Sequence, residues 1–472
     1  MSNKKKYKTL FSNTLIFAIS TVLSKLILAF LLPLYTRKLT TAEYGTAELL
    51  TTISQLVIPV CSFAIQDAVF RFSMGKDNDS SQVLKNGFKV LGIADLLLTI
   101  ISLAFHWYKP LSDWTIYFFA ISVLTMYRSV LSLYVKAIGK SLPFAIDVIL
   151  YNSLLAGLNV LFLTTLNLGL SGYFIAMALA NLFSFVYLAF NSNIVKLFRV
   201  KFDTHLLKQM LLYSAPLIIN SISWGLTHVA DKVMLTEMKS SDATGIYSVA
   251  SKIPSLLSLI TGVFSQAWTI SAIQDYQSEK DSRFYSNIFT LTHISTVLGG
   301  LLILAFNNNL LPYFVGGDFR EAFMYSPILL LGTVFLMYSN FYSPIYSAMM
   351  KSKQIMYSAL GGAIINLIIN AVLIPIIGIM GACIATATSY AFIVVFRMVN
   401  VNKYMKIDFD VIKFIISILI YIIATVVTAC NIEHGFPIVC IISIITIAAL
   451  YYNVLKRATN LIKAKLLRRK IN

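Results

Sequence analysis

Charged side chains are scarce in this 472-residue sequence, and no Walker-type glycine loop occurs in it. Asp, Glu, Lys and Arg together make up 12% of the residues, whereas 58% are hydrophobic. This composition excludes a water-soluble domain of this length. The chain is therefore predicted to be an integral membrane protein. It is not expected to hydrolyse ATP itself, because it lacks the loop that would hold the phosphates.

Cysteine is also scarce, and no two cysteines have the Cys-x-x-Cys spacing. Each of the four lies in or at the edge of an apolar run: Cys61, Cys383, Cys430 and Cys440. Buried free thiols are the favoured interpretation. A disulfide between Cys430 and Cys440, across a short outer loop, is the alternative.

Long apolar runs are abundant, and fourteen of them are long enough to cross a hydrocarbon core of about 30 Å as a helix. They lie at about 10–34, 44–70, 84–105, 114–135, 143–165, 170–190, 209–236, 244–272, 286–306, 325–350, 355–376, 379–399, 411–430 and 436–455. The fold is therefore predicted to be an all-α integral membrane fold with about 14 transmembrane helices. Pro59, Pro216 and Pro254 fall inside these runs and allow kinks.

Basic residues predict the orientation of the chain. If both termini are cytoplasmic, the cytoplasmic loops and tails hold 29 of the 38 Lys and Arg residues, Arg397 among them, and the outer loops hold five. The positive-inside rule therefore favours an even number of spans with both termini in the cytoplasm. Basic loops that face anionic lipid also explain the net charge of +18, so no nucleic-acid partner is expected.

The pattern Gly-x-x-Gly-x-x-Ile-Ala-x-Ala occurs twice, from Gly169 to Ala178 and from Gly378 to Ala387. Each copy follows an apolar segment that begins with Lys-Ser, at 140 and 351, and that carries an asparagine near its end, at 159 and 370. The chain is therefore predicted to be two copies of one unit. A recurring glycine turn between two helices would give the same local pattern and is the alternative.

Six predicted spans separate the two copies, so both halves should have the same orientation. We expect two parallel six-helix lobes, at 1–200 and 201–405, around a central cavity, followed by helices 13 and 14 and a basic tail at 406–472. Duplicated membrane bundles commonly place a substrate site where their halves meet.

Ionisable residues inside the predicted spans are candidate site residues, because each costs about 2.5–3.5 kcal/mol on insertion scales unless it faces water or a partner. The cations are Lys25, Arg128, Lys232 and Lys252. The acids are Glu48, Asp67, Asp95, Asp147 and Asp231.

Cations at two depths would suit a ligand that carries phosphate charges. Cavity function is favoured for Lys25 and Arg128, whereas snorkelling of Lys232 to the outer interface is an equal alternative. An ion pair is expected between Asp67 and Arg71, which are four residues apart. The other acids are candidates for ion coupling or charge pairing, namely Glu48, Asp95, Asp147 and Asp231. No catalytic or metal-binding residue is predicted.

Several motifs resemble those of bacterial polysaccharide flippases. The segment HVADKVMLTEMKSSDATGIYSVASKI, from His228 to Ile253, resembles the signature of their seventh and eighth helices, and LPLYTRKLTTAEYG, from Leu32 to Gly45, is similar to their first outer loop. The segments VFSQAWTISA at 263–272 and AVFRF at 68–72 also fit, as do both glycine repeats. The chain is identified as a member of the O-antigen and capsule repeat-unit branch of the multidrug/oligosaccharidyl-lipid/polysaccharide exporter superfamily.

This resemblance implies a flippase rather than an enzyme, with no cofactor. The implied substrate is an oligosaccharide on undecaprenyl pyrophosphate, moved from the inner to the outer leaflet of the bacterial cytoplasmic membrane by alternating access. The resemblance also implies coupling to an H⁺ or Na⁺ gradient, and binding of pyrophosphate or acidic sugars by Lys25, Arg128, Lys232 and Lys252. Expected partners are membrane lipids and the polysaccharide polymerase and chain-length machinery.

Three alternatives stay open. A lipid II flippase shares the 14-helix plan, but we would expect more arginines on its early helices than this chain has. A multidrug antiporter usually has twelve spans and a more apolar cavity. A membrane-embedded glycan polymerase or ligase usually needs a long extramembrane loop for its acid–base groups, and this sequence has none.

Overall fold

The computed structural model describes residues 23–24, 27, 30–74, 79–192, 194, 200–258, 264–265, 268–269, 271–272, 282–349, 351–430 and 435–456. Within these ranges the chain consists of helices and short connections, without a β-strand. Nine of the described helices are long and apolar enough to cross a membrane, and each coincides with a predicted span. The prediction of an all-α membrane fold is confirmed, while the total of 14 helices stays a prediction.

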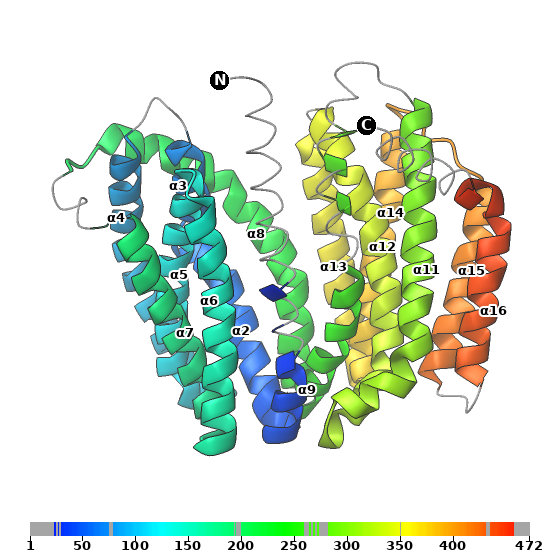
Figure 1. The fold of residues 1–472 in the computed structure, drawn as a ribbon, viewed down its shortest axis with the longest axis horizontal. Coiled ribbons are helices and arrows are strands. Elements are labelled where there is room, and N and C mark those ends of the chain that lie inside the picture. The colour runs from blue at the N-terminus through cyan, green and yellow to red at the C-terminus, as the bar shows by residue number, and fades with distance from the viewer. Residues whose placement is uncertain are drawn as a thin grey trace, which may run out of the picture. The chain divides into compact units, whose positions relative to one another are not determined.

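The described helices gather into two compact units, Met1–Gly245 and Ile246–Asn472 (Figure 1). The first unit contains α2 (Thr41–Cys61), α3 (Ile65–Ser73), α4 (Ser80–Phe105), α5 (Thr115–Ala137), α6 (Ser141–Val160), α7 (Gly169–Ser192) and α8 (Thr204–Met238). The second contains α11 (Ser282–Phe314), α12 (Ala322–Ala348), α13 (Ser352–Ile377), α14 (Ile379–Asn402), α15 (Val411–Ala429) and α16 (Gly435–Leu450). Helix α9 (Ser241–Ala250) contains the division between the units.

The two units do not divide the chain where the sequence repeat does. Helix α8 follows the predicted boundary at residue 200, yet it packs against α2, α3 and α4 of the first unit. Helices α15 and α16, predicted as a separate pair, pack against α11 and α12 of the second unit. The predicted lobe limits at 200 and 405 come from the sequence repeat, which the packing units do not test. These limits, and a cavity between the lobes, therefore stay predictions.

The predicted span 44–70 is a broken helix rather than a continuous one. Helix α2 ends at Cys61, α3 begins at Ile65, and the two helices differ in direction by 60°. Phe63 and Ala64 between them adopt left-handed backbone conformations, with φ of 54° and 48°. Pro59, one turn earlier, has no N–H to continue the helix, and its carbonyl instead accepts from the Ala64 N–H at 2.8 Å.

Both glycine repeats form a helix–turn–helix structure, α6–α7 in one unit and α13–α14 in the other (Figure 1). Gly169 and Gly378 make the turns with φ of 55° and 60°, where any other residue would be strained. A Cβ on Gly172 would lie 3.0 Å from the Phe162 Cβ, and one on Gly381 would lie 2.6 Å from the Leu373 carbonyl carbon. Each repeat therefore encodes a sharp turn followed by close helix contact.

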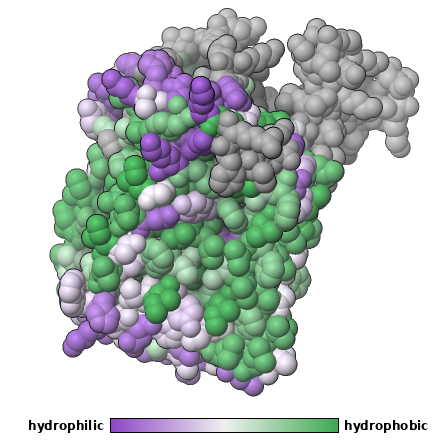
Figure 2. All heavy atoms as spheres, turned by 90° about the vertical axis from the view of Figure 1, so that its left-hand side faces the viewer, coloured by the Kyte–Doolittle hydropathy of each residue, from purple (hydrophilic) through white to green (hydrophobic). Residues whose placement is uncertain are grey.

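The outward faces of the helices in the first unit are apolar. On α4, the side chains of Ile93, Leu96 and Ile100 are at least half exposed, and on α7 Phe190 is 79% exposed. Figure 2 shows this face as a broad hydrophobic surface, with hydrophilic residues gathered mainly along one edge. So large an exposed apolar surface matches contact with lipid rather than water.

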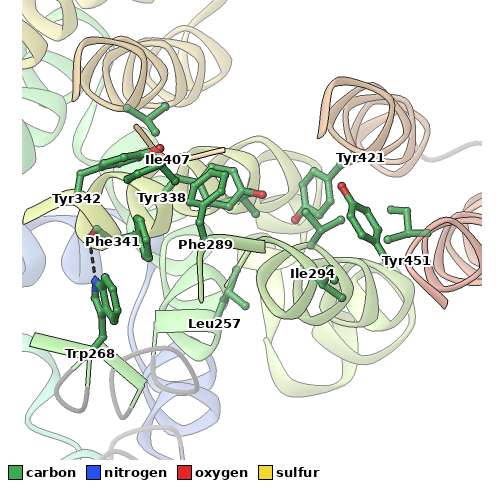
Figure 3. Packing of buried hydrophobic residues seen from close by; sticks show 14 of the residues in the cluster. Leu257, Trp268, Phe289, Ile294, Tyr338, Phe341, Tyr342, Ile407, Tyr421 and Tyr451 are labelled. Carbon is green, nitrogen blue, oxygen red and sulfur yellow. Dashed lines mark hydrogen bonds between the residues drawn. The ribbon is translucent and has the colours of Figure 1, made fainter. Parts of the chain in front are cut away.

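Aromatic side chains are prominent in the core of the second unit, among a larger number of aliphatic ones (Figure 3). Trp268 stacks on Phe341 with ring centroids 4.8 Å apart, and its Nε1 donates to the Phe341 carbonyl at 2.9 Å. Phe289 of α11 contacts Phe341 and Tyr342 of α12, and Phe414 of α15. The rings thus connect three helices of this unit.

All four cysteines lie in the described part of the chain and are free thiols. Three of them are buried, as expected, whereas Cys430 is exposed at the end of α15. The alternative of a disulfide between Cys430 and Cys440 is therefore wrong.

The backbone contact between α2 and α9 yields a stability prediction. A Cβ on Gly45 would lie 1.9 Å from the Ser241 carbonyl oxygen, so Gly45→Ala must force the helices apart. We expect a loss of about 3 kcal/mol in the free energy of unfolding, measured as a lower Tm of the purified protein. The matched control is Gly92→Ala on α4, where a Cβ meets nothing within 4 Å. The control should keep or raise the Tm, because alanine favours helix more than glycine does.

Candidate functional site

A buried ion pair joins α2 and α8 in the first unit. The Lys232 Nζ lies 2.8 Å from the Glu48 Oε2 and 2.7 Å from the Thr52 Oγ1. The Tyr44 hydroxyl donates to the Glu48 Oε1 at 3.0 Å. Glu48 and Lys232 are each 8% exposed. Because both charges have close polar partners, the cost of removing them from water is partly offset.

The spacing of residues on α2 explains this arrangement. Tyr44, Glu48 and Thr52 follow one another at intervals of four, which places them on one face of a helix. Helix α2 begins immediately after Thr40, whose hydroxyl accepts from the Glu43 N–H, and the Glu43 carboxylate accepts in return from the Thr40 N–H. This capping box defines the start of the helix and hence the register of the polar face.

Further polar and aromatic side chains surround the pair. The Thr244 hydroxyl donates to the Lys232 carbonyl at 3.2 Å and lies 2.8 Å from the Thr236 hydroxyl. The Tyr35 ring lies edge-on to the Tyr173 ring, with centroids 5.0 Å apart. The surroundings of the pair thus combine hydroxyl groups with aromatic rings.

A second charge cluster joins α5, α6 and α7. The Arg128 Nη2 lies 3.2 Å from the Asp147 Oδ2, and its Nε donates to the Ser184 hydroxyl. Ser184 in turn donates to the other carboxylate oxygen of Asp147, and Ser132 donates to Oδ2 at 3.2 Å. The guanidinium also lies over the Tyr151 ring, 3.9 Å from its centroid. Asp147 and Ser184 are fully buried, which makes this cluster a rigid junction of three helices.

Asp95 occupies a third polar position, on α4. Its Oδ2 accepts from the Tyr127 hydroxyl of α5 at 2.8 Å, whereas its Oδ1 is buried and has no hydrogen-bond partner among the described residues. Asp231, beside Lys232 on α8, is fully buried.

The structure thus brings four predicted site residues together as two pairs, Glu48 with Lys232 and Arg128 with Asp147. Lys232 does not snorkel to the interface, because its carboxylate partner holds it inside the helices. Lys252 lies half-buried in the helical residues 252–258 of the second unit, and Lys25 lies outside the described residues. The roles of these residues in binding and coupling stay predictions.

The ion pair expected between Asp67 and Arg71 does not form in the described structure. The prediction placed both residues at the end of one continuous helix. Instead the residues lie on the short helix α3, after the break at Phe63 and Ala64, with Arg71 exposed.

Sequence reasoning missed the burial of Arg397, which it assigned to a cytoplasmic loop. Helix α14 continues to Asn402, and Arg397 is fully buried within it. Its Nε donates to the Ser358 hydroxyl at 2.9 Å, and its Nη1 donates to the Ser339 carbonyl at 2.9 Å and to the Ser343 hydroxyl at 2.6 Å. The sequence signal that could have revealed it is a set of serines on the two neighbouring helices. Ser339 and Ser343 lie on α12, and Ser358 lies on α13.

Apolar helices with buried charge clusters define a polytopic membrane protein with polar sites inside its helical units. The model of the polysaccharide biosynthesis protein family matches residues 10–269, more than half of the chain, and the MatE model matches residues 216–372. The chain belongs to the polysaccharide biosynthesis protein family. No protein with a curated description matches the sequence.

Several solved transporters share this fold. The lipid II flippase MurJ, in an inward closed conformation, is 14% identical over 93% of this chain and 99% of its own, with a TM-score of 0.63. An inward-facing multidrug resistance MATE family transporter of the MOP superfamily is 12% identical over 87% and 96% of the two chains, with a TM-score of 0.62. A MOP superfamily transporter from Pyrococcus furiosus is 12% identical over 83% and 94%, with a TM-score of 0.58.

The family match and the fold agree, because flippases and transporters of the MOP superfamily share the fold of this chain. The family identified from the sequence motifs is confirmed. At these identities the structural likeness establishes the fold and leaves the substrate to other arguments.

Breaking the buried pair of α2 and α8 should be strongly destabilising. We expect Glu48→Gln or Lys232→Met alone to cost about 3–5 kcal/mol, because each leaves one buried charge without its partner. The double variant should recover most of that loss, as measured by thermal unfolding of the four proteins in a double-mutant cycle. Lys239→Met, at an exposed position two turns beyond Lys232, is the matched control and should have little effect. Additive losses in the double variant would contradict the pairing.

Proposed function

We propose that this protein is a flippase for oligosaccharide repeat units carried on undecaprenyl pyrophosphate, which it moves from the inner to the outer leaflet of the bacterial cytoplasmic membrane. The translocated repeat units would be used to assemble O-antigen, capsule or exopolysaccharide. The proposal rests on membership of the polysaccharide biosynthesis family together with the paired cations inside the helices of the first unit.

The Glu48–Lys232 pair is the observation that carries the proposal. A phosphate group that leaves water requires a cation to compensate its charge. The Lys232 ammonium is such a cation, and in the absence of phosphate the Glu48 carboxylate neutralises it. Competition by pyrophosphate for Lys232 would release Glu48, and a released carboxylate in apolar surroundings binds H⁺ or Na⁺ readily. Exchange of partners would thus couple substrate movement to an ion gradient during alternating access.

Complementation in cells tests this function. Deletion should cause undecaprenyl-linked repeat units to accumulate on the cytoplasmic leaflet, and the natural protein should clear them. Lys25→Ala, Arg128→Ala and Lys232→Ala should each impair clearance at equal abundance in the membrane, because each removes a proposed phosphate partner. Lys239→Ala, which removes an exposed lysine near the end of α8, should clear the precursor normally.

Other outcomes of the deletion would identify a different transporter. Accumulation of lipid II instead of a repeat-unit precursor would indicate a lipid II flippase. Unchanged surface glycan and unchanged precursor would remove the polysaccharide assignment, and drug efflux should then be measured. Loss of polymerised glycan with normal translocation of the precursor would indicate a polymerase or ligase.

The exposed thiol of Cys430 tests the proposed orientation with both termini in the cytoplasm. This residue follows α15, at the loop predicted to face outward, while the other three cysteines are buried. A membrane-impermeant maleimide should therefore label the natural protein in right-side-out membrane vesicles, and it should not label a Cys430→Ser variant. Labelling that requires inside-out vesicles would reverse the orientation.

A further inference from the structure

In each unit one arginine joins three consecutive helices, and the arginine of the second unit is fully buried. In the first unit, Arg128 of α5 contacts Asp147 of α6 and Ser184 of α7. In the second unit, Arg397 of α14 contacts Ser358 of α13 and the backbone of α12. The two junctions use the same helix triplet of the repeat, but the guanidinium comes from a different helix in each.

The register of the repeat identifies which residues correspond. The Lys-Ser pairs that begin α6 and α13 are 211 residues apart, and so are the two buried asparagines near the ends of these helices. The same spacing relates Arg128 to Ser339 and Asp147 to Ser358. Ser358 therefore occupies the position at which the first unit has its carboxylate.

The second junction has a positive charge without a negative one. Residues 115–192 contain one acidic residue, Asp147, whereas residues 322–402 contain none. Helices α12, α13 and α14 therefore cannot supply a carboxylate to Arg397. Among the described residues, no ion pair compensates this guanidinium, which stays protonated at neutral pH.

Two hydrogen-bond donors at this junction are also unused. The Arg397 Nη2 and the Ser339 hydroxyl are both buried without a hydrogen-bond partner in the described structure. The two residues that carry these donors are in direct contact, because the Arg397 Nη1 donates to the Ser339 carbonyl at 2.9 Å. An isolated buried charge with unsatisfied donors is costly, and a bound anion removes both costs at once.

We propose that a small inorganic anion of the chloride type binds between α12, α13 and α14 and takes the electrostatic place of the missing carboxylate. The Arg397 Nη2 and the Ser339 hydroxyl supply the donors, while Ser343 and Ser358 hold the guanidinium in place. Arg397 is fully buried, so a lipid phosphate group on the membrane surface cannot reach it. The site is separate from the charge pairs of the first unit and stabilises the helix triplet rather than contacting the transported substrate.

Thermal unfolding of the purified full chain in detergent tests the site. Sodium chloride is compared with sodium gluconate at equal ionic strength, because gluconate is too large for a buried site. Chloride should raise the Tm saturably, by about 3 °C, and bromide should substitute for it. Equal Tm values in chloride and gluconate would overturn the proposal.

Substitutions at Ser358 separate a specific site from a general effect of salt. Ser358→Asp restores the carboxylate that the first unit has, so its Tm should no longer depend on chloride. Ser358→Asn, which has nearly the same shape without the charge, should keep the natural response. A full chloride response in Ser358→Asp would overturn the proposal.

Arg397→Met provides the second variant, in case Ser358→Asp fails to fold. This substitution removes the charge that the anion compensates, and it should abolish the chloride response while leaving the junction filled. A chloride-dependent Tm that persists in Arg397→Met would place the anion elsewhere and overturn the assignment.

Discussion

A charge inside apolar helices is costly unless it has a partner, and the architecture of the first unit depends on two such partnerships. Glu48 and Lys232 connect α2 with α8, while Arg128 and Asp147 connect α5 with α6. Apolar side chains alone discriminate poorly between lipid and a neighbouring helix. The charge pairs therefore determine which helices become neighbours as well as contributing to stability.

The two repeats share a backbone plan but stabilise it differently. In the first unit, charge pairs and hydroxyl groups lie between the helices. In the second, stacked rings such as Trp268 and Phe341 fill the core, and Arg397 is the buried arginine of its helix triplet. Both copies of the glycine repeat make their turns at a glycine, Gly169 or Gly378, while the side chains between the helices differ, with charge pairs in the first unit and stacked rings in the second.

Local features of the fold could be predicted from the sequence, whereas contacts between distant residues could not. The glycine turns were predictable because a positive φ is a property of single residues. The charges at Glu48 and Lys232 were conspicuous within apolar runs, but their pairing across 184 residues is invisible to helical periodicity. Arg397 was missed because a basic residue lowers the hydropathy near the end of α14 in either of two environments. Hydropathy cannot distinguish an arginine that faces water from one that contacts buried serines.

The contact between Gly45 and α9 also limits how this chain can evolve. A steric conflict between side chains can be relieved by a smaller residue on the opposite side. The atoms that face Gly45 are the carbonyl of Ser241 and the amide nitrogen of Gly245, which every amino acid possesses. No second substitution at those positions can make room, so a genetic screen that starts from a larger residue at position 45 should return revertants rather than compensated pairs.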